Sequence, residues 1–501
     1  MRCLYLTQEL APYFMEGGLG QTARALPAAL EREHGIVHDL VVPYYPWLVE
    51  RHSLRTERVW QGPPVTIGDV DTPVLVERLL DSPGAGEVFL LRADHWYARE
   101  GIYRDARYVE FADAVARAAF FGAGVAQWVN GTDRRYDIVH GNDWQSGPAL
   151  AHLRSLRASD PAPALLVNVH NAEYTGRVGP GQLRHLGLPP AWQETLTQYG
   201  GQAGLLLLGV LAADAATTGS PTYAEELRAR TGTALGSALG TLPLTGVVAG
   251  IDTRLWQPAA QGRPTEPYDA ATVNQGKAAN KRLLQQHLGL REDPDVPLFG
   301  VCSRLVPEKG VDLLLEAATP LVRDGSAQLV VVGHGDTDTV NALTALTERA
   351  PAGACHVPRF TQDLAWLTYA GADFTLMPSR VEPCGLNQLI AMTYGCVPVV
   401  SKVGGLRDTV TDLTADPATG TGFALPELTA DAVRRTMLTA ARWLTGPARQ
   451  VEAVRRRAMS QDWSWTRSAR ATAALYARTA AAPRTPVGTL TTPAAPMAAH
   501  H

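Results

Sequence analysis

Short runs of apolar residues alternate along the chain with longer stretches in which apolar residues recur every three or four positions. In the first half, the short runs occupy 2–7, 39–45, 136–140 and 164–170, and a helical pattern covers 108–128. Continuous apolar runs are typical of strands buried on both faces, and the amphipathic stretches are typical of helices that cover a sheet. The alternation therefore predicts a parallel sheet with helices on its faces.

A second series of the same kind begins near residue 297. It comprises strands at 297–303, 327–333, 374–378 and 397–401 and helices at 310–322, 362–372 and 384–395. Two successive series predict an α/β protein with two Rossmann-like domains. Ligands of open parallel sheets bind at the carboxyl ends of the strands, so we expect the two domains to face each other across one deep cleft.

The boundary between the series is predicted within 250–267, where Pro, Gly and polar residues replace the periodic pattern. We accordingly assign 1–252 to an N-terminal domain and 253–455 to a C-terminal domain. A helical pattern at 456–480 is expected to pack back on the N-terminal domain. The tail at 481–501 is rich in Pro, Ala and Thr, and we expect it to be disordered.

Composition narrows the possible partners. The chain has 501 residues, a formal net charge of −4 and no basic block, so a nucleic-acid partner is not expected. The most apolar run, 203–216, is too short to span a bilayer and predicts a buried helix. The opening MRCLYLT lacks the parts of a signal peptide and predicts a strand, so we expect a cytoplasmic location without membrane contact.

The cysteines follow no metal-binding or disulfide pattern. They stand at 3, 302, 355, 384 and 396, and no two form a CxxC pair or a Cys/His cluster. We therefore expect reduced thiols, mostly in the core, and no metal site.

Two glycine pairs follow predicted strands and precede predicted helices. The first is Gly17–Gly18 in EGGLG, and the second is Gly404–Gly405 in VGGLRDTV. Glycines in such loops let backbone N–H groups and a helix N-terminus approach a phosphate. A glycine pair alone is also common turn chemistry, so each loop by itself indicates an anion site only weakly.

Arg304 and Lys309 stand at the end of one predicted strand, in SRLVPEKG, just before a helix. A guanidinium, an ammonium and a helix N-terminus together suit a departing diphosphate, on which negative charge builds up. The alternative is a surface turn with two solvated cations. The whole chain contains four lysines, at 277, 281, 309 and 402, so the lysine here favours the functional interpretation.

Three further loops carry candidate polar groups. Glu382, in PSRVEPCGLNQ, can hydrogen-bond sugar hydroxyls or simply cap the following helix. Asp143 in VHGNDWQSG, with His170 and Tyr174 in VHNAEYTG, follows two other strands and can line a polyol site. A lone histidine at such a position is otherwise a structural residue.

Taken in order, these segments resemble the bacterial glycogen and starch synthase family, retaining glucosyltransferases of the GT-B fold. The resemblance covers about residues 1–478. It includes SPTYAEEL 220–227, GIDTRLWQP 250–258, KAANKRLLQQHLGL 277–290, SRLVPEKGVDLLLEA 303–317, YAGADFTLMPSRVEPCGLNQL 369–389 and YGCVPVVSKVGGLRDTV 394–410. Related transferases carry a second glutamate eight residues after the first; here Ile390 stands eight after Glu382, which is the glycogen synthase pattern.

The resemblance implies a role for each candidate residue. Arg304 and Lys309 would neutralise the leaving diphosphate, Glu382 would sit by the transferred ring, and His170 would contact that ring. Donor-binding positions would be Gly17, Gly18, Gly333, Gly335, Cys384, Gly385, Leu386, Gly404 and Gly405. Positions on the sugar and acceptor side, in the N-terminal domain, would be Met15, Gln21, Asp143, Trp144, Asn171 and Tyr174.

The resemblance also implies what the reaction consumes. The donor would be a sugar or cyclitol on a nucleoside diphosphate, with ADP or GDP as possible nucleotides, and the acceptor would be malto-oligosaccharide-like. The family is expected to need no cofactor and no metal, since Arg304 and Lys309 would neutralise the leaving diphosphate as a metal ion does in other transferases.

The chain departs from the family mostly in its N-terminal half. The family motif K-x-G-G-L-[GA]-D has Met15 for the lysine and Gln21 for the aspartate. Asn142 and Gln145 stand where histidines are usual, and Leu205–Leu208 cover a segment that usually carries Asn and Lys. Losing one charge-assisted contact costs about 1.5–3 kcal/mol, enough to slow an ordinary donor about tenfold or more.

These departures leave three hypotheses. The first is a pseudo-glycosyltransferase with an altered sugar site, which joins a hexose-like or unsaturated cyclitol unit to the 4-position of a malto- or amino-oligosaccharide, as in amino-oligosaccharide antibiotic biosynthesis. The second is an ordinary glycogen synthase that transfers glucose from ADP-glucose to an α-1,4-glucan. The third is a nucleotide-sugar-binding protein without turnover.

Overall fold

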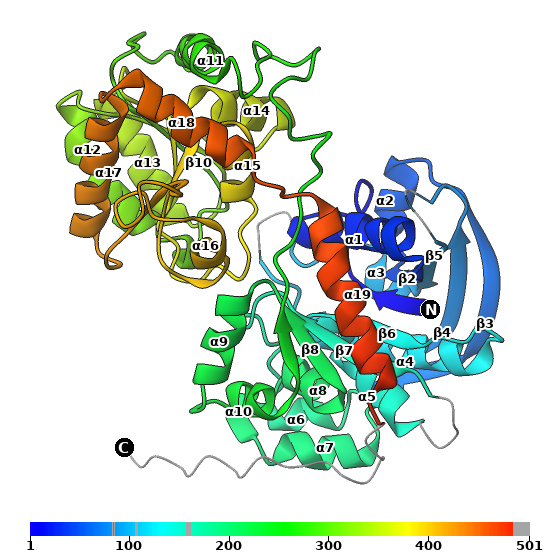
Figure 1. The fold of residues 1–501 in the computed structure, drawn as a ribbon. Helices are drawn as coiled ribbons and strands as arrows, with labels where there is room; N and C mark the ends of the chain where they lie inside the picture. The colour runs from blue at the N-terminus through cyan, green and yellow to red at the C-terminus, as the bar shows by residue number, and fades with distance from the viewer. Residues whose placement is uncertain (83, 85, 106–108, 157–161, 484–501) are drawn as a thin grey trace. The chain divides into compact units, whose positions relative to one another are not determined.

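The computed structural model describes residues 1–501 except 83, 85, 106–108, 157–161 and 484–501, and the chain forms two compact units (Figure 1). Unit 1 comprises residues 1–250 with the segment from Trp465, and unit 2 comprises Ile251–Ser464. Nearly all of the tail predicted at 481–501 lies outside the described residues. Each unit is built on a sheet of mainly parallel strands covered by helices, which confirms the predicted α/β class.

Unit 1 contains, in its described residues, a nine-stranded sheet ordered β3-β4-β5-β2-β1-β6-β7-β8-β9. The strands are β1 (Arg2–Leu6), β2 (Val37–Pro43), β3 (Thr56–Ile67), β4 (Val70–Leu79), β5 (Val88–Arg92), β6 (Ile138–Asn142), β7 (Ala164–Val169), β8 (Ala215–Thr218) and β9 (Leu244–Gly246). The neighbouring strands in the run β5-β2-β1-β6-β7-β8-β9 pair in parallel. At the other end of the sheet, β4 pairs antiparallel with both β3 and β5.

The helices of unit 1 include a long C-terminal one that returns to the first helix. They are α1 (Gly18–His34), α2 (Pro46–Arg51), α3 (Asp94–Tyr97), α4 (Ala114–Gly131), η1 (Trp144–Ser146), α5 (Gly147–Ser155), α6 (Pro180–Leu183), α7 (Pro190–Thr197), η2 (Gly200–Gln202), α8 (Leu205–Ala212), α9 (Pro221–Ala229), α10 (Ala234–Thr241) and α19 (Trp465–Ala481). α19 packs against α1, where Leu26 and Leu30 share one apolar cluster with Trp465 and Tyr476 (Figure 1). The hydroxyl of Tyr476 lies 2.7 Å from Nδ1 of His140 and 3.4 Å from Nε2 of His38.

Unit 2 has a parallel sheet whose described strands run in the order β12-β11-β10-β13-β14-β15. The strands are β10 (Leu298–Cys302), β11 (Gln328–Val332), β12 (Ala354–Val357), β13 (Phe374–Met377), β14 (Val397–Val400) and β15 (Phe423–Ala424). The helices are α11 (Val273–Leu288), η3 (Pro307–Lys309), α12 (Val311–Arg323), α13 (Thr337–Arg349), α14 (Gln362–Gly371), α15 (Asn387–Thr393), α16 (Gly404–Thr409), α17 (Ala430–Leu444) and α18 (Ala448–Met459).

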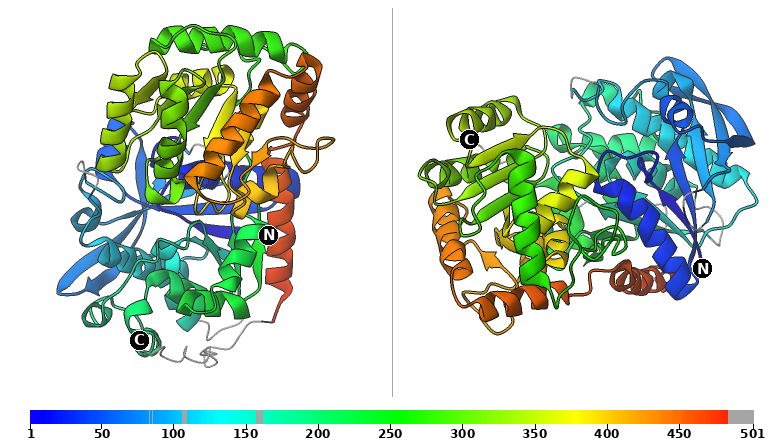
Figure 2. Two further views of the ribbon diagram at one scale, coloured as in Figure 1. Left: turned by 90° about the vertical axis from the view of Figure 1, so that its left-hand side faces the viewer. Right: turned by 90° about the horizontal axis from the view of Figure 1, so that it is seen from above.

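Helices cover both faces of the unit 2 sheet, as the views in Figure 2 show. Alternate residues of β10 point to opposite faces. Phe299 and Val301 join the apolar cluster that contains Leu314 of α12 and Met437 of α17. Gly300 points the other way, where a Cβ would lie 3.0 Å from side-chain atoms of α14. The all-apolar strands of the sequence thus reflect burial from two sides.

Both sheets reverse their strand order at the first strand of the unit. In unit 1 the chain passes from β1 to β2 on one side and later to β6 on the other; in unit 2, β11 and β13 flank β10 in the same way. Open parallel sheets bind ligands beyond the carboxyl ends of the strands at this reversal. The loops after β1 and β6, and those after β10 and β13, are therefore the places to look for a site.

Several predicted elements needed correction. The helix predicted at 108–128 begins at Ala114 and ends at Gly131, and the helix predicted at 384–395 begins only at Asn387, because a loop with Gly385 at φ +71° precedes it. The hairpin β3–β4 was not predicted, since most of β3 is exposed and lacks a continuous apolar run. The segment 456–480 contains the end of α18 and most of α19.

The apolar run at 203–216 forms the buried helix α8 and the start of β8. None of the helices in the described part of the chain is both long and apolar enough to cross a bilayer.

The buried contact between α19 and the unit 1 sheet predicts acid sensitivity. Burial lowers the pKa of His38 to about 4, below its ordinary value. A lowered histidine pKa means that the unfolded chain takes up the proton first, so stability falls as pH drops from about 6.5 toward 4, by up to about 3 kcal/mol for this group. We expect thermal unfolding of His38→Gln to depend less on pH over this range than that of the parent protein. Parallel pH profiles of the two proteins would contradict the assignment.

A glycine at the carboxyl edge of unit 2 predicts a second effect. Gly310 has φ +65°, and a Cβ there would lie 2.0 Å from the carbonyl oxygen of Pro378. Gly289 has φ +68° but open space around its Cβ position, so it is a matched control. We expect Gly289→Ala to cost about 1–2 kcal/mol, the strain of a left-handed residue, and Gly310→Ala to cost distinctly more because η3 must move from β13. Calorimetry of both variants measures this, and equal melting temperatures would contradict it.

Candidate functional site

Lys309 and Glu382 meet at the carboxyl edge of the unit 2 sheet, where the strand order reverses. Nζ of Lys309 donates to Oε2 of Glu382 at 2.7 Å, and Oγ of Ser379 donates to the same oxygen at 3.0 Å. Glu382 is 5% exposed, while the side chain of Lys309 is 21% exposed. The carboxylate therefore holds the ammonium in a partly dry place with one side open, where its charge is less screened than at the surface.

Arg304 lies on the same edge, in the loop after β10, and its residue is exposed. None of the ion pairs found among the described residues includes its guanidinium. The next residue is firmly placed, because the N–H of Leu305 donates to the carbonyl of His334 at 2.9 Å. A fixed backbone with an exposed fork of N–H donors suits contact with a diphosphate.

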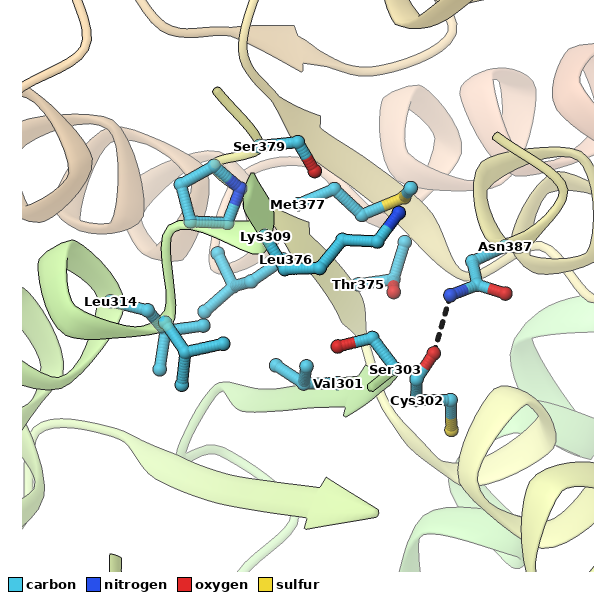
Figure 3. Close-up of a pocket in the computed structure, with 12 residues that line it drawn as sticks. Val301, Cys302, Ser303, Lys309, Leu314, Thr375, Leu376, Met377, Ser379 and Asn387 are labelled. Carbon is cyan, nitrogen blue, oxygen red and sulfur yellow. Dashed lines mark hydrogen bonds between the residues drawn. The ribbon is translucent and has the colours of Figure 1, made fainter. Parts of the chain in front are cut away.

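A small pocket lies beside Lys309, and its lining comes wholly from unit 2 (Figure 3). The lining residues are Val301, Cys302, Ser303, Lys309, Val311, Leu314, Thr375, Leu376, Met377, Pro378, Ser379 and Asn387. Nδ2 of Asn387 donates to the carbonyl of Cys302, which joins the start of α15 to the end of β10. One ammonium and several hydroxyl and amide groups thus gather at the reversal point, above apolar side chains of the sheet.

The predicted donor-binding glycines allow backbones to approach each other. A Cβ at Gly333 would lie 1.8 Å from the carbonyl oxygen of Ser303, and one at Gly335 would lie 2.2 Å from that of Leu305. These contacts pack the loop after β11 against the loop that carries Arg304. These glycines are therefore required to place the loop that carries Arg304, independently of any contact that they make with a ligand.

The loops after β13 and β14 approach each other in the same way. A Cβ at Gly405 would lie 2.0 Å from the carbonyl oxygen of Cys384, and the N–H of Gly405 donates to the carbonyl of Glu382 at 3.0 Å. That N–H is therefore used within the protein and does not remain for a phosphate. Leu386 precedes α15, and Gly404 begins α16.

The first glycine loop holds a carboxyl group that belongs to the chain itself. Oε2 of Glu9 accepts hydrogen bonds from the N–H groups of Glu16 and Gly17, both at 2.8 Å, and Oε1 accepts one from the hydroxyl of Tyr103 at 2.9 Å. Burial raises the pKa of Glu9. These two N–H groups are therefore used within the protein, and the contact of Gly17 with a donor phosphate stays a prediction.

Sequence reasoning missed Glu9, although its position just after the first strand was a usable signal. Glu16 also has a structural role, since its Oε1 accepts a hydrogen bond from the N–H of Ile102 at 3.0 Å. Met15 is 45% exposed beside this loop, and Gly18 begins α1 and is exposed. Gln21 is half-buried on the first turns of α1.

Asp143 stands at the carboxyl end of β6, beside β1, in a strained backbone. Its φ is +53°, and Ser53 is the other residue besides glycine with positive φ in the described chain. Its Oδ1 accepts a hydrogen bond from the N–H of His170 at 2.8 Å. Burial raises the pKa of Asp143, although His170 and the N–H groups of residues 170 and 171 oppose the rise. Strain of this kind is kept where the surrounding structure requires it, often at functional sites.

The loop after β7 brings His170 next to Asp143. Nε2 of His170 lies 2.9 Å from Oδ1 of Asn142. Oδ1 of Asn171 accepts a hydrogen bond from the N–H of Glu173, and Tyr174 is 36% exposed in the same loop. Trp144 is buried, and the position of a Cβ on Gly176 would lie 2.4 Å from its ring. Asp143 and His170 thus form a contact pair, while Trp144 supports the loop.

The leucines of the altered segment lie in the core. Leu205, Leu206, Leu207 and Leu208 are all buried in α8. Sequence reasoning noted this segment only as a departure from the family; the structure uses these four side chains for packing. In the part of the chain that the structure describes, no group of three or more His, Cys, Asp or Glu residues is arranged to hold a metal ion.

Comparisons with known proteins agree with this arrangement. Residues 2–241 match the model of the starch synthase catalytic domain, and residues 285–442 match that of glycosyl transferases group 1. The chain is 37% identical to glycogen synthase of Rhodospirillum rubrum over 94% of this chain and 96% of that protein. It is 36% identical to glycogen synthase 2 of Geobacter sulfurreducens over 95% of this chain and 98% of that protein.

Solved structures show the same fold. The catalytic domain of starch synthase IV from Arabidopsis thaliana, bound to ADP and acarbose, is similar with a TM-score of 0.84 and 25% identity over 96% of this chain and 99% of that chain. Sucrose-phosphate synthase from Thermosynechococcus elongatus shares the fold with a TM-score of 0.59 and 18% identity over 95% of this chain and 98% of that chain. From these matches and the residues at the two sheet edges, the chain belongs to the glycogen and starch synthase family of GT-B glycosyltransferases.

Proposed function

We propose that this chain is a retaining, metal-independent glucosyltransferase that extends an α-1,4-glucan from a nucleoside diphosphate glucose, with ADP as the nucleotide. Relatives named glycogen synthase, matched over nearly their whole length, support this proposal. The related starch synthase that binds ADP and acarbose supports the choice of nucleotide and of a malto-oligosaccharide-like acceptor.

The observation that carries the proposal is the ion pair of Lys309 and Glu382 at the reversal point of the unit 2 sheet. The ammonium is held 2.7 Å from a carboxylate and stays partly exposed. A diphosphate that arrives at this edge meets the ammonium of Lys309, which Glu382 already holds in place, and the exposed guanidinium of Arg304. Preorganised cations of this kind stabilise the charge that develops on a leaving group.

The proposed step balances without a metal. The bond between the anomeric carbon of the donor sugar and the diphosphate oxygen breaks, and its electron pair stays on that oxygen. The 4-hydroxyl oxygen of the acceptor then bonds to the same face of the anomeric carbon, and its proton passes to the leaving diphosphate. Arg304 and Lys309 neutralise the diphosphate, while Glu382 would hydrogen-bond the transferred ring.

Unit 1 would contribute contacts to the sugar and the acceptor. Asp143 and His170 are joined by a 2.8 Å hydrogen bond at the corresponding edge of its sheet. A carboxylate accepts hydrogen bonds from sugar hydroxyls, and an imidazole can contact the ring beside the reacting carbon.

A second candidate function has an altered ring as the transferred group. The side chain of Met15 is 45% exposed beside the glycine loop, where the family motif has a lysine, and Gln21 replaces the aspartate. An apolar side chain there suits a less polar donor, such as an unsaturated cyclitol in a pseudo-glycosyl transfer. The names of the relatives favour glucose, so the cyclitol reaction ranks second.

The decisive experiment measures nucleotide release and product mass with ADP-, UDP- and GDP-glucose or an activated cyclitol, using maltotriose and an aminodeoxy-capped oligosaccharide as acceptors. We expect ADP release with growth of maltotriose by one hexose.

Lys309→Ala should lower kcat by about 10²–10³-fold, the usual effect of removing one preorganised donor. Arg323→Ala, an exposed cation on α12, is the matched control and should leave the rate unchanged. Donor binding without any ADP release would instead support a binding protein.

Met15→Lys distinguishes the two catalytic hypotheses. If glucose is the natural ring, the restored cation should raise kcat/KM for ADP-glucose by about tenfold, the value of one charge-assisted contact. If a cyclitol is the natural ring, the same change should lower turnover of the cyclitol donor. Met15→Leu, which keeps an apolar side chain, is the control for both outcomes.

A further inference from the structure

Asn142 is a buried hydrogen-bonding centre beside His170. It ends β6, and in the parallel register it stands opposite Asn168 of β7. Alternate residues of a strand share a face, so Asn168 and the following His170 approach Asn142 from the same side. Three polar atoms reach Oδ1 of Asn142: the hydroxyl of Tyr5 at 3.1 Å, Nδ2 of Asn168 at 3.3 Å and Nε2 of His170 at 2.9 Å.

The orientation of the Asn142 carboxamide is fixed from both ends. Its Nδ2 donates to the carbonyl of Leu6 at 2.8 Å, and its Oδ1 accepts the hydroxyl proton of Tyr5. Turning the amide over would place an oxygen against the Leu6 carbonyl and lose that bond. Asn142 is fully buried, so the lost bond would not be replaced by water. The atom that faces His170 is therefore an oxygen.

From this geometry we infer that Asn142 is a positioning residue, which fixes His170 with the proton on Nε2 and leaves Nδ1 as the unprotonated nitrogen. An oxygen 2.9 Å from a ring nitrogen requires a proton between them. Nδ2 of Asn168 lies 2.8 Å from Nε2 and donates to Oδ1 of Asn142 at 3.3 Å, so the oxygen available to Nε2–H is that of Asn142. The backbone N–H of His170 is bound to Asp143, so the residue is held at both ends.

The consequence for chemistry rests on the function proposed above. With Nε2–H directed into the protein, Nδ1 is the nitrogen that can accept a hydrogen bond from a hydroxyl of the transferred ring. A carboxamide neither gains nor loses a proton near neutral pH, so in this chain the partner of His170 keeps one protonation state.

The test reads the imidazole directly. The protein labelled with [¹⁵N]histidine gives two-bond ¹H–¹⁵N correlations whose pattern identifies the protonated nitrogen, and a His170→Gln sample identifies the signals of His170. We expect the neutral Nε2–H form in the parent protein. A neutral Nδ1–H form would overturn the inference without any variant being made, and this readout does not depend on activity. If the proposed function is wrong, the transfer assay shows it, while the spectrum still identifies the protonated nitrogen of His170.

Two variants test the cause. Asn142→Leu keeps the size but removes the oxygen, and we expect mixed protonation of the two nitrogens and a fall in kcat of about tenfold, with KM for donor and acceptor nearly unchanged.

Tyr476→Phe is the matched control, because it removes a buried hydroxyl from the hydrogen-bonded His140 in the same unit without touching Asn142. It should leave the spectrum of His170 and kcat unchanged. If Asn142→Leu, folded by circular dichroism, kept a pure Nε2–H signal, Asn142 would not be the cause and the inference would be wrong.

Discussion

Close backbone approach at the carboxyl edge of the unit 2 sheet is the constraint on which the candidate site depends. Gly310, Gly333, Gly335 and Gly405 each stand where a Cβ would lie within about 2 Å of a neighbouring carbonyl oxygen. The loops after β10, β11, β13 and β14 can therefore pack together, which brings Lys309 to Glu382. The ion pair needs this packing, because neither residue belongs to a long element that would place it alone.

The loops at the carboxyl edges of the two sheets are held by different contacts. At unit 2 a carboxylate holds a partly exposed cation, so the edge retains positive charge for an incoming anion. At unit 1 the N–H groups of Glu16 and Gly17 donate to the buried carboxyl group of Glu9. The glycine loops of the two units are therefore held in different ways, because a backbone carbonyl accepts the N–H of Gly405 and a side chain accepts that of Gly17.

The departures from the family motif also differ in physical meaning. The leucines of α8 are buried and belong to the core, whereas Met15 is exposed beside the glycine loop. Asn142 is fully buried and meets His170 through an oxygen at 2.9 Å. These positions are thus not equivalent: the leucines pack the interior, Met15 is exposed near the loop, and Asn142 gives His170 a neutral amide partner.

The sequence by itself determined the α/β class, the main parallel strands and the family, because buried strands are continuously apolar and the motifs SRLVPEKG and PSRVEPCG are specific. It also singled out Lys309, Glu382, Asp143 and His170. Only the tertiary structure decided their partners. The contacts of Glu382 with Lys309 and of Asn142 with His170 join residues 73 and 28 positions apart, which no local pattern encodes. Glu9 and the hairpin β3–β4 escaped prediction because a lone acid and an exposed strand carry no apolar periodicity.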